Sequence, residues 1–135
     1  MTSAADLVRE LYEAYQRRDW EAAAGLLEED AVVEMPATAE RLVGRSKVVE
    51  FQRDYPEPWG DLSLLRIVGK GETAAAEIEV VAEEATFRMA AFWRAGEGLL
   101  REGVEYWVTV GGEEPPPNRA HAQAQGPVRK VAQGT

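Results

Sequence analysis

The second half of the chain constrains the fold most, because residues 61–110 read as strands interrupted by glycines. The stretches LSLLRIVGKG, TAAAEIEVVAEEATFRMAAFWRAGEG and LLREGVEYWVTVGG are rich in β-branched and aromatic residues, which favour strands. The segments GKGE and AGEG are typical of hairpin turns. The pattern predicts strands at about 61–68, 72–83, 84–94 and 98–110, joined as an antiparallel sheet.

Side chains alternate along these strands, so Glu105 and Trp107 share one face while Tyr106 lies on the other. On the preceding strand, Arg88 and Phe92 likewise share a face. Both faces are largely apolar. A sheet that is apolar on both faces needs two covers. Helices can supply one cover, and we expect a second copy of the chain to supply the other.

The first half of the chain predicts mainly helices. Apolar residues recur at helical spacing over residues 4–18, and a second helix is expected at about 20–29. The segment AVVEMP, residues 31–36, reads as a short strand stopped by its proline. Residues 37–45 read as a loop, and Ser46 is the expected cap of a third helix, KVVEFQRDY.

Composition indicates one globular domain and excludes several kinds of site. The 135 residues are 45% hydrophobic and 29% charged, which is enough for one core. The absence of cysteine and the single histidine, His121, exclude thiolate chemistry and multi-histidine metal sites. No cofactor is expected, since no glycine-rich phosphate loop or Walker sequence occurs.

The charge pattern and the N-terminal segment suggest where the protein acts. The net charge of −9 comes from distributed acids, which argues against binding nucleic acid. The start, MTSAADLVRELYEAYQRRDW, has no long apolar run, so neither a signal peptide nor a membrane span is expected. A cytoplasmic location is the default expectation.

The last segment, GGEEPPPNRAHAQAQGPVRKVAQGT, differs in composition from the rest of the chain. It has three consecutive prolines and almost no large apolar residue, so it cannot bury enough surface to offset its ordering entropy. We therefore expect a folded domain at residues 1–112 and a flexible, proline-rich tail at residues 113–135.

Taken in order, these elements resemble a nuclear transport factor 2-like domain of the SnoaL-like branch, the relatives of ketosteroid isomerases, polyketide cyclases and limonene epoxide hydrolases. The likeness rests on YEAYQRRDWEAAAGLLEEDAVVEMP, LVGRSKVVEF and GLLREGVEYW, and it covers about residues 5–110. It implies an α+β fold: a cone-shaped barrel in which N-terminal helices pack on a curved, mainly antiparallel sheet. It also implies a hydrophobic pocket between helices and sheet, and a homodimer packed sheet to sheet.

The catalytic residues of ketosteroid isomerases are largely missing. The resemblance places their base at Met35 and their oxyanion-binding acid at Ala90, while their tyrosine falls near Leu11, beside Tyr12 and Tyr15. Steroid isomerisation needs a base and oxyanion donors, so this mechanism is not expected. Chemistry like that of scytalone dehydratase uses histidines that the predicted domain lacks.

The resemblance to limonene epoxide hydrolases is better. Glu105 matches the acid of that family's terminal acid–Tyr–Phe step, and Glu79 could match its other acid. The arginine expected two residues before that acid is replaced by Glu77. Arg88, on the next strand, could take its place. Glu77 and Glu79 also fit a solvated strand face.

The resemblance turns the faces carrying Glu105 and Arg88 toward the pocket, so these are the candidate catalytic residues. We expect the two to pair, which would keep Glu105 ionised at neutral pH. A purely structural ion pair or exposure at the barrel rim stays open as the alternative. The candidate ligand-binding residues are Tyr12, Tyr15, Met35, Phe51, Tyr55, Phe92 and Trp107.

Two function classes follow from these observations. The first is a pocket protein for a small apolar molecule, with or without acid–base chemistry of the isomerase, cyclase or hydrolase kind. The second is a non-catalytic ligand-binding or dimeric accessory protein. A closed, dry pocket and a perturbed Glu105 pKa would favour the enzyme.

Overall fold

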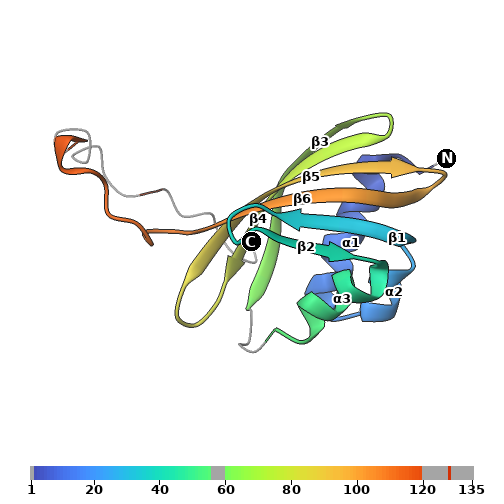
Figure 1. The fold of residues 1–135 in the computed structure, drawn as a ribbon, viewed down its shortest axis with the longest axis horizontal. Helices are drawn as coiled ribbons and strands as arrows, with labels where there is room; N and C mark the ends of the chain where they lie inside the picture. Colours follow the sequence, from blue (N-terminus) through green and yellow to red (C-terminus); the bar gives the residue numbers. More distant parts are fainter. Residues whose placement is uncertain (1, 56–59, 120–127, 129–135) are drawn as a thin grey trace.

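The computed structural model describes residues 2–55, 60–119 and 128. Helices come first and most strands follow, as the sequence predicts (Figure 1). The elements are α1 (Ala4–Arg17), α2 (Trp20–Ala24), β1 (Leu27–Met35), β2 (Glu40–Val43), α3 (Arg45–Arg53), β3 (Asp61–Lys70), β4 (Thr73–Val81), β5 (Thr86–Gly96), β6 (Leu99–Thr109) and the 3-10 turn η1 (Pro117–Arg119).

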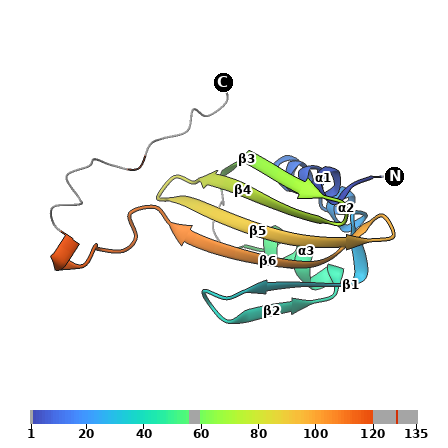
Figure 2. The same cartoon turned by 90° about the horizontal axis from the view of Figure 1, so that it is seen from above.

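The six strands form one curved sheet in the order β2-β1-β6-β5-β4-β3 (Figure 2). Every neighbouring pair is antiparallel except β1 and β6, which are parallel. The sheet does not close on itself, since β2 and β3 remain its two edges. The expected α+β fold is therefore confirmed, and the cone is an open one.

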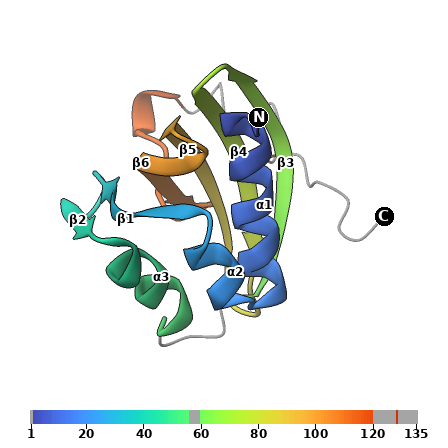
Figure 3. The ribbon, with the colours of Figure 1, turned by 90° about the vertical axis from the view of Figure 1, so that its right-hand side faces the viewer.

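The helices lie on the concave side of the sheet (Figure 3). Helix α1 packs against β3 and β4, and α3 packs against β1. Ser3 caps α1 by accepting a hydrogen bond from the backbone N–H of Asp6 at 3.2 Å, as is usual for a serine at this position. One stripe of α1 is buried against the sheet, and this stripe carries Leu7, Leu11, Tyr12 and Tyr15.

The region between α2 and α3 differs from the prediction. Helix α2 ends at Ala24 rather than near residue 29, because Leu27 already pairs with Leu100 as the start of β1. Residues 40–43, expected to be loop, form β2 and pair with β1. Pairing with neighbouring strands outweighs the helical preference of the segment LLEED. It also outweighs the polar character of residues 40–43.

Helix α3 begins slightly earlier than predicted. Its cap is Gly44 rather than Ser46, and no side chain caps it. Gly44 has φ +94°, in the region that favours glycine, and its N–H donates to the carbonyl of Ala31 at 2.7 Å. This bond ties the start of α3 to β1.

The register between β5 and β6 decides which side chains face the helices. Met89 lies opposite Trp107, Ala91 opposite Glu105, and Trp93 opposite Gly103, and these residues share the concave face. Arg88 and Phe92 therefore point to the convex face, together with Val104 and Val108, which lie opposite them. The expectation that Arg88 and Phe92 face the pocket is wrong, because adjacent residues of a strand face opposite sides.

The ends of the chain are described only in part. The expected tail at 113–135 lies largely at 120–127 and 129–135, outside the described residues, so its flexibility stays a prediction. Within the described residues, no helix is long and apolar enough to cross a membrane.

Candidate functional site

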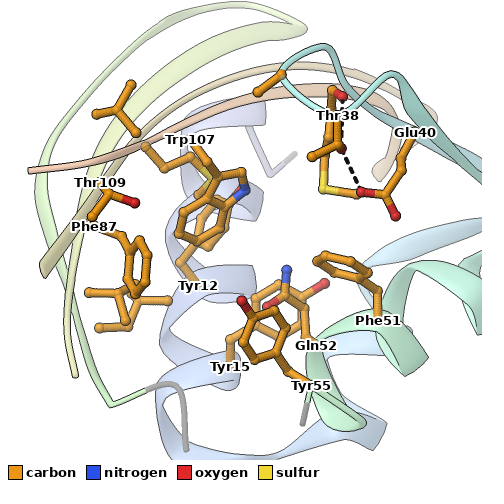
Figure 4. Close-up of a pocket in the computed structure, with 16 residues that line it drawn as sticks. Tyr12, Tyr15, Thr38, Glu40, Phe51, Gln52, Tyr55, Phe87, Trp107 and Thr109 are labelled. Atoms are coloured by element: carbon orange, nitrogen blue, oxygen red, sulfur yellow. Dashed lines mark hydrogen bonds between the residues drawn. The ribbon is translucent and has the colours of Figure 1, made fainter. Parts of the chain in front are cut away.

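A cavity of about 310 Å³ lies between the concave face of the sheet and helices α1 and α3 (Figure 4). Its size is at the lower end of the range for small-molecule pockets. It is lined by Tyr12, Tyr15, Met35, Ala37, Thr38, Glu40, Phe51, Gln52, Tyr55, Leu62, Val80, Phe87, Met89, Trp107, Val108 and Thr109. Most of these side chains are apolar or aromatic, which suits an apolar occupant.

A buried chain of hydrogen bonds lies beside this cavity. The indole N–H of Trp93 donates to the Tyr12 hydroxyl at 2.9 Å, and this hydroxyl donates to Oε2 of Glu105 at 2.8 Å. The indole N–H of Trp107 donates to Oε1 of Glu105 at 3.2 Å. Glu105 is only 3% exposed and Tyr12 1%, so Glu105 is not in water. The Glu105 carboxylate is held in place by the hydrogen bonds from Tyr12 and Trp107.

Local sequence explains how this network is assembled. Tyr12 lies on the apolar stripe of α1, which points it at the sheet. Glu105 lies opposite Ala91, whose small side chain leaves room for the carboxylate. Gly103 leaves room for the Trp93 ring, since a Cβ there would lie 2.7 Å from Cε2 of Trp93. The absence of a side chain at Gly103 therefore positions the indole that donates to Tyr12.

Replacing Gly103 by alanine is expected to lower the free energy of unfolding by about 1–3 kcal/mol, because the added methyl overpacks the site and displaces Trp93. Denaturant melts measure the change. Gly25→Ala is the matched control: a Cβ at Gly25 would meet only ordinary contacts, at 3.5 Å from the carbonyl oxygen of Ala22, and φ there is −67°. We expect Gly25→Ala to be neutral or slightly stabilising. Equal costs for both variants would contradict the role of Gly103.

Burial governs the acid–base properties of these groups. Burial raises the pKa of Glu105 above its ordinary value of 4.5, while the hydrogen bonds from Tyr12 and Trp107 lower it in part. Burial and the nearby Glu105 charge raise the pKa of Tyr12 well above 10.0, so this phenol stays protonated. The pKa of Tyr15 is raised for the same two reasons.

The expected pairing of Glu105 with Arg88 is wrong. Nε of Arg88 donates to Oε2 of Glu79 at 2.7 Å, and its Nη1 lies 3.6 Å from Oε2 of Glu77. Arg88 and Glu79 are directly opposite each other on the convex face, on the far side of the sheet from Glu105. Glu77 in turn pairs with Arg66 at 3.0 Å. Arg88 thus belongs to a set of ion pairs outside the cavity.

Most of the candidate ligand-binding residues do lie around the cavity. Phe92 is the exception: it is 46% exposed on the convex face, where its ring meets that of Tyr106. The candidates that line the cavity are Tyr12, Tyr15, Met35, Phe51, Tyr55 and Trp107. Their location is established by the structure, whereas their role in binding stays a prediction.

Sequence reasoning missed several residues of this site. Phe87, Met89 and Trp93 lie on the same face of β5, so a prediction that turned this face toward the helices would have included all three. Glu40 was missed because its segment was expected to be a loop, in which side-chain direction has no period. Among the described residues, no group of His, Cys, Asp and Glu side chains is placed to hold a metal ion.

Comparison with known proteins adds a family and a fold. A family profile described as a SnoaL-like domain matches residues 8–103. A proposed ketosteroid isomerase from Kribbella flavida DSM 17836 is 29% identical, with a TM-score of 0.79 over 97% of this chain and 91% of that chain. No protein of curated function matches the chain.

More distant solved structures share the fold alone. An NTF-2 like protein of unknown function from Burkholderia xenovorans LB400 is 17% identical, with a TM-score of 0.74 over 96% of this chain and 95% of that chain. An LEH-like epoxide hydrolase of M. tuberculosis is 18% identical, with a TM-score of 0.66 over 78% of this chain and 82% of that chain. These likenesses confirm the expected fold, and shared fold does not by itself assign an activity.

Proposed function

Because the chain belongs to the SnoaL-like domain family, we propose that it binds a small, largely apolar molecule in the cavity between α1, α3 and the sheet. The cavity itself carries this proposal. Six aromatic residues, Tyr12, Tyr15, Phe51, Tyr55, Phe87 and Trp107, line about 310 Å³ of space that the protein's own side chains leave unfilled. Concave, mostly aromatic pockets with a few polar groups are the usual form of small-molecule sites.

Binding without turnover is the function that the geometry supports best. Glu105 is the buried acid of the site, but it is not one of the described residues that line the cavity. Tyr12 and Trp107 lie against the cavity and each forms a hydrogen bond to this carboxylate. A general base must reach the proton that it removes, either directly or through one water molecule, whereas two protein side chains stand between Glu105 and the cavity. In this arrangement Glu105 holds Tyr12 and Trp107 in place and supports the pocket wall.

Acid–base catalysis is the second candidate, and one observation favours it. Both groups that separate Glu105 from the cavity, the Tyr12 hydroxyl and the Trp107 indole, are bonded directly to it. The carboxylate, whose pKa is raised by burial, therefore lies one hydrogen bond away from two groups that line the cavity. The names of two structural relatives, a proposed ketosteroid isomerase and an LEH-like epoxide hydrolase, are consistent with this chemistry.

The binding proposal can be tested with a neutral apolar fluorophore, N-phenyl-1-naphthylamine, whose emission increases in a dry pocket. We expect saturable binding of one probe per chain. Ala37→Trp places a large ring at the cavity, where Ala37 is exposed in the turn between β1 and β2. This variant should weaken binding by more than about tenfold, or 1.4 kcal/mol.

The matched control is Glu10→Trp, which adds the same ring at an exposed position of α1 that does not line the cavity. Glu10→Trp should bind the probe like the unchanged chain. Equal binding by both variants would show that the probe sits elsewhere, and no binding by the unchanged chain would overturn the proposed function.

For assembly, we propose that the convex face packs against a second copy of the chain. Tyr106 is 49% and Val108 55% exposed there, beside the exposed Phe92. Charged pairs such as Arg41 with Glu34 and Arg94 with Glu102 flank this apolar centre. An apolar centre with a polar rim is typical of protein interfaces.

Sedimentation at micromolar concentration should therefore give about twice the chain mass of 14.9 kDa. Tyr106→Arg should shift the equilibrium to the monomer, because it places a charge in the centre of the apolar face. Lys47→Glu, an exposed change on α3, should leave the dimer intact. A monomer at every concentration of the unchanged chain would contradict the proposal.

A further inference from the structure

The aromatic residues of the cavity are arranged as pairs on three of its walls. On α3, the rings of Phe51 and Tyr55 are 6.1 Å apart and inclined at 71°. On the sheet, Phe87 and Trp107 are 6.5 Å apart at 78°. On α1, Tyr12 and Tyr15 are 5.8 Å apart at 72°. The faces of aromatic rings carry partial negative charge and attract cations, so a cavity with such rings on three walls can hold a cation wherever a ring presents its face.

One carboxylate stands at the edge of this ring-lined space. Glu40 lies on β2, opposite Met35, which also lines the cavity (Figure 4). One of its oxygens accepts a hydrogen bond from the Thr38 hydroxyl at 2.5 Å. In the described part of the chain, Glu40 has no ion pair with Lys or Arg, whereas Glu34, on the other face of the same pair of strands, has Arg41 at 3.3 Å.

The described walls of the cavity carry no positive charge. None of the described residues that line the cavity is Lys, Arg or His. The buried Glu105 lies directly behind Tyr12 and Trp107. The whole chain carries a net charge of −9, which raises the local concentration of cations and repels anions. The charges near the cavity and the net charge of the whole chain therefore both favour a positively charged ligand.

From these three observations we propose that the cavity selects an organic cation: an amine or ammonium group held among the aromatic rings near Glu40, on an apolar body that fills the rest of the space. This inference rests on the proposed binding function and gives its ligand a chemical class. Burial of a cation against ring faces favours alkylated ammonium groups, which lose less hydration than a primary ammonium.

The test uses three phenols that differ only in the group at the meta position. 3-(Trimethylammonio)phenol is a permanent cation, 3-tert-butylphenol is its neutral isostere, and 3-hydroxybenzenesulfonate is an anion of similar shape. Isothermal titration calorimetry gives a dissociation constant for each. We expect the cation to bind at least about fivefold more tightly than the neutral isostere, as a partly desolvated cation–aromatic contact provides, and the anion to bind most weakly.

Two variants separate local recognition from general charge. Glu40→Gln should remove most of the preference for the cation and leave the affinity for 3-tert-butylphenol unchanged. Glu34→Gln changes the net charge equally but lies on the convex face, and it should keep the preference. Phe51→Leu, which keeps an apolar wall without a ring, should also reduce the preference for the cation. Thermal melts confirm that each variant is folded.

The outcomes distinguish this inference from the proposal on which it rests. Equal or tighter binding of 3-tert-butylphenol would overturn the cation preference and leave the binding function standing. The same loss of preference in Glu34→Gln as in Glu40→Gln would overturn the role of the cavity carboxylate. Binding of none of the three phenols, together with no binding of the naphthylamine probe, would overturn both.

Discussion

Replacing Tyr12 by phenylalanine is expected to lower the free energy of unfolding by about 2–5 kcal/mol. The change removes one oxygen and leaves two buried groups without this partner: the indole N–H of Trp93 and the carboxylate of Glu105. Each buried polar group that loses its partner costs about 1–3 kcal/mol, and a charged group costs more. Denaturant melts at neutral pH measure the effect directly.

Tyr15→Phe is the matched control. Tyr15 lies one turn further along the same helix, its ring is also buried, and its hydroxyl forms no hydrogen bond with another described residue. We expect this variant to change stability by less than about 1 kcal/mol, because no buried partner is lost. Similar costs for Tyr12→Phe and Tyr15→Phe would show that the hydrogen-bond chain contributes nothing.

A double-mutant cycle locates the partner of Glu105. Tyr12→Phe combined with Glu105→Gln should show coupling of about 1–3 kcal/mol, since the two side chains are bonded at 2.8 Å. Arg88→Met combined with Glu105→Gln should show almost none, because these residues lie on opposite faces of the sheet. The reverse result would restore the ion pair that the sequence suggested and would contradict the register of β5 and β6.

Acidification should stabilise the unchanged protein relative to Glu105→Gln. The folded-state pKa of Glu105 is raised, so between its ordinary value of 4.5 and the raised value the folded chain binds more protons than the unfolded chain. Stability from this group is fully present below pH 4.5 and is lost as pH rises through the folded-state pKa. As the pH is lowered from 8, the unfolding free energy of the unchanged chain should increase relative to that of Glu105→Gln.

Glu102→Gln gives a control of the opposite sign. The hydrogen bond from Arg94 lowers the pKa of this exposed carboxyl on the same strand, so its contribution is lost as pH falls. A pH-independent difference between the unchanged chain and Glu105→Gln would contradict the burial of Glu105 as a titrating group. Together the two variants separate burial from surface pairing along one strand.

Periodicity along the chain was sufficient for much of the fold. The strand pattern of residues 61–110 and the apolar stripe of α1 are local properties, because side-chain direction repeats every two residues in a strand and every 3.6 in a helix. The same stripe is enough to place Tyr12 and Tyr15 on the inner side of their helix. The order of the quoted segments was enough to indicate the family.

What the sequence left open was decided by contacts between distant segments. Alternation along a strand assigns its residues to two faces, but the packing of the helices determines which face is inside. The sequence prediction took the wrong face of β5 as the inner one and therefore placed Arg88 and Phe92 at the cavity. Strand β2 forms because it pairs with the edge of β1. The sequence of residues 40–43 alone therefore did not predict the direction of the Glu40 side chain. The hydrogen bonds of Tyr12 connect it to Trp93, which is 81 positions away in the sequence, and to Glu105, which is 93 positions away. No local pattern encodes such a contact, since it forms only when α1 packs across the sheet.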